Sequence, residues 1–249
     1  MINTAMFPLL KKKSCLEPAD KNFFRFPSNI LNQFHSDDIF LTSFPRSGNT
    51  WMRHLLAGSL EKEPNHLIPD LYVPGFLDVP KQSDKGALLY KSHTICDLEN
   101  FKHIYLFRNA EDSLVSYAHF AGRSAGGCDK FVCRSIRTWA YQIQAVQSMA
   151  SAYPEKWFLL SYETLLNQTK ESLQAVFDWL KIEMTGLQID QAIEDAKKVP
   201  KINKGVGQYI AAGSGKGKQQ LESYTLELIE EHAKPSYLEL LKMESLKKN

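Results

Sequence analysis

The stretch Ile39-Phe40-Leu41-Thr42-Ser43-Phe44-Pro45-Arg46-Ser47-Gly48-Asn49-Thr50-Trp51 predicts a strand, a tight loop and a helix in direct succession. Residues 39–44 form a short apolar run that ends at a cluster of Pro, Ser and Gly, which is typical of a buried strand. From Thr50 to Leu60 the apolar residues recur at helical spacing. A strand, a loop and a helix in this order open a βαβ unit.

The same alternation continues along the chain. Short apolar runs predict further strands over residues 87–90, 104–107 and 157–160. Helices are predicted over residues 110–120, 129–149, 170–180 and, with a break at Pro235, 225–249. Residues 203–218 are rich in Gly and Lys and are expected to form a loop. Short strands alternating with helices favour one α/β domain, a parallel sheet with helices on both faces.

Length and composition narrow the class of protein. A chain of 28.4 kDa buries about 70% of its extended surface on folding, enough for one core without disulfides or a metal. Lys and Arg number 30 against 28 Asp and Glu, a net charge of +2. This balance argues against a protein built around a long nucleic acid, and it leaves room for a small anion held by a few basic groups.

Cysteine usage and hydropathy point to a compartment. The four cysteines form no C-x-x-C pair, which argues against a secreted disulfide scaffold, and no apolar run approaches the ~20 residues of a membrane span. We therefore expect a cytoplasmic protein without a membrane span. Its first segment, residues 1–35, is expected to be an irregular leader, and residues 36–249 are expected to form the single domain.

The loop before the first helix has the residues of an anion site. A helix N-terminus offers backbone N–H groups and a partial positive charge. Gly48 lets the backbone approach a ligand, Arg46 brings a full charge, and Ser47, Asn49 and Thr50 add side-chain donors. The loop is not a Walker A motif, because no Gly lies five positions before Gly48 and no Lys follows it. The alternative is an ordinary helix cap.

On these residues the loop resembles the 5′-phosphosulfate loop of sulfotransferases, written Y-P-K-S-G-T-T-W in that family. These enzymes use 3′-phosphoadenosine 5′-phosphosulfate, or PAPS, as co-substrate. Trp51 matches, while Phe44 replaces Tyr, Arg46 replaces Lys and Asn49 replaces Thr. The resemblance implies that residues 46–51 bind the phosphosulfate. It also implies a P-loop-like nucleotide-binding architecture.

A second motif lies after the third predicted strand. Arg108 stands where an open parallel sheet exposes its strand ends, and Ser116 follows two turns into the next helix. This segment is similar to the family's R-[ND]-P-x-D-x-x-x-S-x-x-x-F, with Ala110 in place of Pro. The resemblance implies that Arg108 and Ser116 bind the 3′-phosphate. Asp112 is expected to be structural, pairing with a neighbouring group.

Two weaker matches follow. Ser161-Tyr162-Glu163 is similar to the family's S-Y-E-x-L, which implies that Tyr162 approaches the nucleotide; plain packing is the alternative. Gly215-Lys216-Gly217-Lys218 resembles the family's R-K-G loop, with Gly215 where Arg is usual. The resemblance implies that Lys216 and Gly217 close over the 3′-phosphate, the alternative being a solvated loop.

The chemistry is carried by Lys91-Ser92-His93, which resembles the family's K-[TS]-H element. An imidazole, with an ordinary pKa of about 6.5, suits a general base near neutral pH. The resemblance implies in-line sulfuryl transfer, in which His93 takes the proton of an alcohol or phenol. Arg46, Lys91 and the loop N–H groups would stabilise the charge on the leaving phosphate. No carboxylate cluster forms a clear magnesium site, so we expect no metal requirement.

Other functions stay open at this point. A P-loop-like small-molecule kinase would share the anion site but needs Mg²⁺ ligands and a loop Lys. A non-catalytic nucleotide-binding module would keep Arg108 and Ser116 without needing Lys91 or His93. The expected partner is a small-molecule hydroxyl acceptor, with residues 66–85 and 121–131 lining its site by analogy with the family.

Overall fold

The computed structural model describes residues 38–59, 70–71, 89–93, 101–123, 125–198 and 214–244. The predicted leader over residues 1–35 lies outside these ranges. Most of the predicted acceptor segment 66–85 and most of the predicted loop 203–218 also lie outside them.

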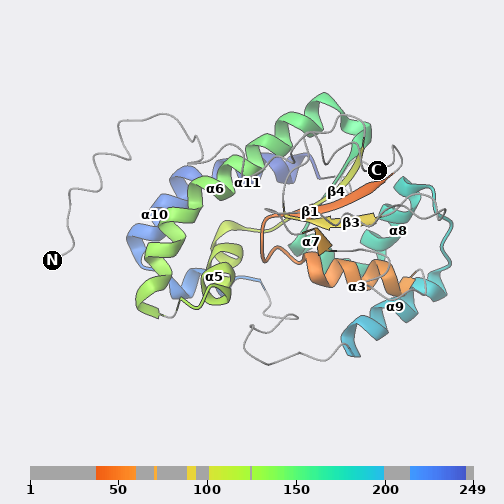
Figure 1. The fold of residues 1–249 in the computed structure, drawn as a ribbon, viewed down its shortest axis with the longest axis horizontal. Helices are drawn as coiled ribbons and strands as arrows, with labels where there is room; N and C mark the ends of the chain where they lie inside the picture. Colours follow the sequence, from red (N-terminus) through yellow and green to blue (C-terminus); the bar gives the residue numbers. More distant parts are fainter. Residues whose placement is uncertain are drawn as a thin grey trace.

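The described strands form one sheet in which every pair of neighbours runs parallel (Figure 1). The strands are β1 (Ile39–Ser43), β2 (Asp70–Leu71), β3 (Leu89–Ser92), β4 (Lys102–Phe107) and β5 (Trp157–Ser161), in the order β2-β3-β1-β4-β5. After β1 the chain forms β2 and β3 on one side of β1, and it then crosses to form β4 on the other side. Open α/β sheets bind ligands outside the carboxyl ends of the strands at such a reversal.

The connections between the strands are mostly helical. In chain order the described helices are α3 (Asn49–Ser59), α5 (Ala110–Phe120), α6 (Ala125–Ala152), α7 (Tyr162–Asn167), α8 (Thr169–Leu180), α9 (Gly186–Lys198), α10 (Ser223–His232) and α11 (Lys234–Lys242). Two single 3₁₀ turns, η3 (Pro154–Lys156) and η4 (Lys218–Gln220), precede β5 and α10. None of the helices in the described part of the chain combines the length and apolar character that a bilayer crossing demands.

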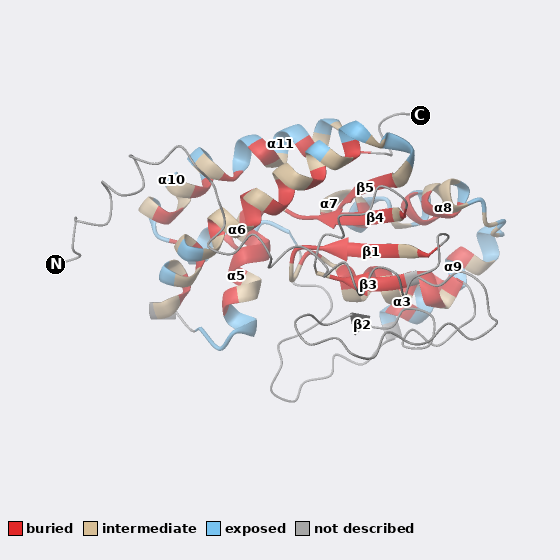
Figure 2. Cartoon of the chain, turned by 45° about the horizontal axis from the view of Figure 1, so that its top comes forward, coloured by how far each residue is buried: buried red, intermediate tan, exposed pale blue. Residues whose placement is uncertain are grey.

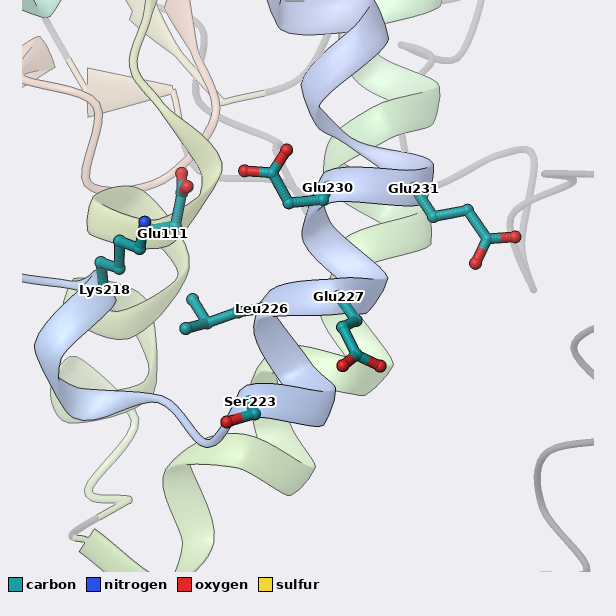
Figure 3. A pocket seen from close by; sticks show the side chains of 7 residues that line it. All are labelled: Glu111, Lys218, Ser223, Leu226, Glu227, Glu230 and Glu231. Carbon is teal, nitrogen blue, oxygen red and sulfur yellow. The ribbon is translucent and has the colours of Figure 1, made fainter.

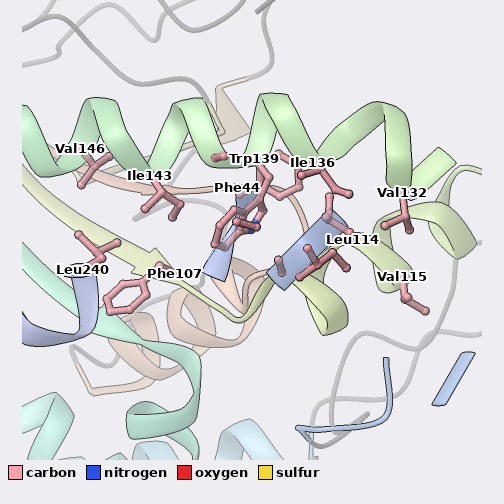
Figure 4. Packing of buried hydrophobic residues seen from close by; sticks show 14 of the residues in the cluster. Phe44, Phe107, Leu114, Val115, Val132, Ile136, Trp139, Ile143, Val146 and Leu240 are labelled. Atoms are coloured by element: carbon pink, nitrogen blue, oxygen red, sulfur yellow. The ribbon is translucent and has the colours of Figure 1, made fainter. Parts of the chain in front are cut away.

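Successive side chains of β4 point to opposite faces of the sheet, and on each face they pack into a separate hydrophobic core. Tyr105 and Phe107 join the core that α5, α6, α10 and α11 cover, with Trp139 of α6 fully buried in it (Figure 4). Ile104 and Leu106 join the opposite core, under α3, α8 and α9. Strands β1, β4 and β5 are accordingly buried along most of their length (Figure 2). Apolar residues on both faces are what a parallel sheet covered on both sides requires.

The predicted α/β domain is confirmed, with local differences. The helix predicted over 110–120 matches α5, whereas the second predicted strand begins two residues later, at Leu89. Helix α9 was absent from the predicted elements, although Ile189, Ala192 and Ala196 recur at helical spacing and are buried. The C-terminal break lies at Ala233 rather than at the predicted Pro235. Proline is tolerated in the first turn of a helix, and there it begins α11.

Candidate functional site

Parallel strands bring four predicted site segments to one edge of the sheet. The loop that contains Arg46 follows β1, His93 follows β3, Arg108 follows β4 and Tyr162 follows β5. Because all of these strands run in the same direction, their carboxyl ends open together (Figure 1). Residues more than 100 positions apart in the sequence therefore reach one site.

Two residues give the loop after β1 its shape. The backbone is left-handed at Arg46, with φ of 70°, and at Gly48, with φ of 97°. A Cβ on Gly48 would lie 2.6 Å from Cδ2 of Tyr162, so both the backbone angle and the available space require glycine. A left-handed arginine is strained, and such strain persists where the surroundings impose it. Here the Arg46 carbonyl accepts a hydrogen bond from Nη1 of Arg108 at 3.3 Å.

Ser47 gives the loop a buried hydroxyl. Its side chain is fully buried, and its hydroxyl has no hydrogen-bond partner among the described residues. A buried polar group without a partner costs about 1–3 kcal/mol. The hydroxyl lies just before α3, whose first turn leaves backbone N–H groups without intrahelical acceptors. The loop therefore holds donors that a bound anion would satisfy.

The two predicted phosphate anchors are joined. Arg46 donates from Nε to Oγ of Ser116 at 3.0 Å, which links the loop to α5. Since Ser116 Oγ accepts this bond, its own hydrogen can still be donated. The Arg46 guanidinium also lies 5.4 Å from the centre of the half-exposed Phe120 ring. With the bond from Arg108 to the Arg46 carbonyl, these residues form one basic cluster.

Tyr162 supports this cluster from the start of α7. Its ring lies 4.3 Å from the Arg108 guanidinium carbon and meets Trp51 edge to face at 5.9 Å. Burial raises the pKa of Tyr162, and the nearby Arg108 opposes that shift without cancelling it. A neutral phenol therefore holds the guanidinium through its ring face. Tyr162 thus packs against Arg108 and Trp51, and its contact with a nucleotide stays a prediction.

The Asn49 side chain donates hydrogen bonds to buried groups of the fold. Its Nδ2 donates to Oγ of Ser43 at 3.0 Å, to the Leu41 carbonyl at 3.2 Å and to the Ser92 carbonyl at 3.4 Å. The side chain thus ties the end of β1 to the end of β3, where the sequence analysis assigned it to the phosphate. The other two loop residues, Thr50 and Trp51, are half-buried in the first turn of α3.

His93 is oriented by backbone groups. Its Nδ1 lies 2.9 Å from the Ser43 carbonyl oxygen, which can only accept, so the ring proton sits on Nδ1. In the neutral ring the lone pair is then on Nε2, the arrangement that a general base needs. Gln142 of α6 donates from Nε2 to the His93 carbonyl at 3.2 Å. Lys91 lies two residues earlier in β3 and is 4% exposed.

The segment that contains Lys216 and Gly217 packs against the first turn of α5. Gly217 donates its backbone N–H to Oδ1 of Asp112 at 2.7 Å, and the Gly215 N–H reaches Oδ2 at the same distance. Lys216 between them is exposed. Asp112, expected to be structural, also contacts Arg108, with 3.5 Å between Nη2 and Oδ2.

Gln142 contacts the predicted site residue His93, and the sequence analysis did not single it out. It is fully buried on α6, between the core residues Trp139 and Val146. A polar residue within an apolar helical stripe is the signal that could have found it.

A hollow beside α5 and α10 is lined in part by Glu111 and Lys218, the chain neighbours of Asp112 and Gly217 (Figure 3). Its lining is Glu111, Lys218, Ser223, Leu226, Glu227, Glu230 and Glu231. Four carboxylates against one lysine make this lining acidic, which disfavours an anionic ligand.

The structure first defines a class of protein: an α/β fold of the P-loop-like kind, with a basic cluster at the carboxyl edge of its sheet. The family model described as the sulfotransferase domain matches residues 36–233, and the chain belongs to this family. The chain is 26% identical over 205 residues to bovine sulfotransferase 1A1, covering 67% of this chain and 68% of that protein. It is 30% identical over 182 residues to flavonol 3-sulfotransferase of Flaveria bidentis, covering 59% of this chain and 57% of that one.

Solved structures show the same fold. Mouse sulfotransferase SULT7A1, complexed with PAP, superposes with a TM-score of 0.61 at 16% identity, covering 84% of this chain and 87% of that one. Retinol dehydratase, in complex with androsterone and the inactive cofactor PAP, gives a TM-score of 0.64 at 14% identity, covering 86% and 83%.

Proposed function

We propose that this chain transfers a sulfuryl group from PAPS to a hydroxyl of a small-molecule acceptor. The observation that carries the proposal is the connected cluster of Arg46, Ser116 and Arg108 beside the buried, unpartnered Ser47 hydroxyl. Family membership and the PAP and androsterone held by the structural neighbours support it. The cytoplasmic location and the independence from a metal stay predictions.

The cluster matches a ligand with two separated phosphates. Arg46, Ser47 and the N–H groups of the first turn of α3 would hold the 5′-phosphosulfate. Arg108 and the remaining Ser116 hydrogen would hold the 3′-phosphate. Because Arg46 and Ser116 are hydrogen-bonded, the position of one phosphate is coupled to that of the other.

Proton transfer falls to His93. Nε2 takes the proton of the acceptor hydroxyl as the acceptor oxygen bonds to sulfur. The bond between sulfur and the phosphate oxygen breaks, and its electron pair leaves on the phosphate of 3′-phosphoadenosine 5′-phosphate. Arg46, Lys91 and the α3 N–H groups stabilise that charge.

Turnover of labelled PAPS against a panel of phenols and alcohols tests the reaction. We expect His93→Ala to lose roughly 10²–10⁴-fold in turnover while its affinity for 3′-phosphoadenosine 5′-phosphate stays unchanged. The control is His232→Ala on α10, far along the chain from the site. A His93→Ala enzyme with the wild-type rate would show that the base is another group.

Binding measurements separate the alternatives. Titration should show much tighter binding of 3′-phosphoadenosine 5′-phosphate than of ATP with Mg²⁺; the reverse order would favour a kinase. Nucleotide binding without turnover of any acceptor in the panel would favour a binding module. Arg108→Ala and Ser116→Ala should each weaken nucleotide binding. Wild-type affinity in both variants would overturn the 3′-phosphate assignment.

A further inference from the structure

We propose that Asp112 is a positioning residue that seats residues 214–217, the Gly-Lys turn, against the Arg108 side of the nucleotide site. The turn would thereby hold Lys216 where its ammonium group contacts the 3′-phosphate. This inference rests on the sulfotransferase function proposed above and names a group that acts through others.

The carboxylate binds the turn with both oxygens. Oδ1 accepts the Gly217 N–H at 2.7 Å, and Oδ2 accepts the Gly215 N–H at 2.7 Å and the Ser214 hydroxyl at 3.2 Å. Lys216 is therefore fixed on both sides by neighbours that share one carboxylate. These bonds span more than 100 residues of sequence, so they determine where the turn sits in the tertiary structure.

The turn also has no room to move toward α5. A Cβ on Gly217 would lie 2.4 Å from the Glu111 carbonyl oxygen and 2.7 Å from the Asp112 nitrogen. Gly215 has φ of 89°, a backbone that L side chains rarely adopt. The two glycines on either side of Lys216 thus let the backbone of the turn pack directly on the first turn of α5.

The same carboxylate orients Arg108. Asp112 is 4% exposed, and its Oδ2 lies 3.5 Å from Nη2 of Arg108 and 3.0 Å from Nδ2 of Asn109. One buried acidic group therefore connects the turn that carries Lys216 to the arginine assigned to the 3′-phosphate. A carboxamide cannot replace it, because its NH₂ group would face a backbone N–H where an acceptor is needed.

Two ligands that differ only in the 3′-phosphate give a readout that general damage to the fold would not. We expect Asp112→Asn to bind 3′-phosphoadenosine 5′-phosphate about tenfold more weakly, the effect of losing one well-placed charged contact. Its affinity for adenosine 5′-phosphate should stay unchanged. Asp190→Asn, which removes an exposed partner of Lys170, is the matched control and should change neither affinity.

Lys216→Ala keeps the proposal testable if Asp112→Asn fails to fold. It should lower the preference for the 3′-phosphate, Lys218→Ala should not, and the double variant with Asp112→Asn should lose no more than Asp112→Asn alone. An equal loss for both nucleotides in Asp112→Asn, or a wild-type preference in Lys216→Ala, would overturn the proposal. Wild-type protein that binds neither nucleotide would instead overturn the proposed function.

Discussion

Replacing Asn49 by alanine removes an amide whose two hydrogens are shared among three buried acceptors. Two hydrogen bonds are lost, each with a net value of about 0.5–1.5 kcal/mol, and the acceptors at the ends of β1 and β3 stay buried. We therefore expect the free energy of unfolding to fall by about 1–3 kcal/mol. For a chain of this size, that lowers the melting temperature by roughly 2–12 °C.

Urea unfolding without nucleotide measures the change in the free energy of unfolding. The slope of that free energy against urea concentration shows whether the surface exposed on unfolding is the same in both proteins. Gln191→Ala is the matched control, since Gln191 donates an amide to Asp195 on the exposed side of α9. It should change the free energy of unfolding by less than about 0.5 kcal/mol. If Asn49→Ala is as stable as the control but binds 3′-phosphoadenosine 5′-phosphate more weakly, the amide faces the ligand and the assignment to the strand ends is refuted.

Three further perturbations test the site. Gly48→Ala forces a Cβ against Tyr162 at a positive φ, so it should cost about 1–3 kcal/mol of stability and weaken nucleotide binding, as read by thermal unfolding and calorimetry; an unchanged melting temperature would contradict the packing. Gln142→Leu removes the donor to the His93 carbonyl and should lower kcat several-fold with nucleotide affinity intact; an unaffected kcat would show that the bond does not position the base. For Asp112, burial alone would raise the pKa, but hydrogen bonds from the Gly-Lys turn and Asn109, with the Arg108 charge, outweigh it and lower the pKa. Its stabilisation is therefore complete above about pH 4 and is lost as the pH falls through the lowered pKa, so the stability difference between wild type and Asp112→Asn should shrink in acid; a difference that grows there would reverse the sign.

The local elements of the fold could be predicted because they depend on near neighbours in the sequence. Apolar runs placed β1, β4 and β5 within two residues, and helical spacing placed α5 and α8. The loop after β1 could be interpreted as an anion site for the same reason, since a glycine before a helix and an arginine beside it act within one turn; that assignment stays a prediction. Helix α9 was missed although Ile189, Ala192 and Ala196 recur at helical spacing, so the sequence did carry a signal for it.

The contacts between segments could not be predicted. Asn49 looked like a phosphate donor as long as only its neighbours in the loop were considered, and its acceptor on β3 lies 43 residues away. The bond from Gly217 to Asp112 joins residues 105 positions apart. Neither pairing follows from periodicity, because both depend on which strands lie side by side.

The amino-acid sequence alone determines the chemistry available here. It supplies a glycine before a helix N-terminus, two arginines and a histidine, each within its own short segment. The tertiary structure decides how these groups combine. The strand order β3-β1-β4 brings the Ser43 carbonyl to His93 and Arg46 to Ser116, because parallel strands expose their carboxyl ends at a single edge. The strand order thus orients His93, the proposed base, and couples Arg46 to Ser116, the two proposed phosphate anchors.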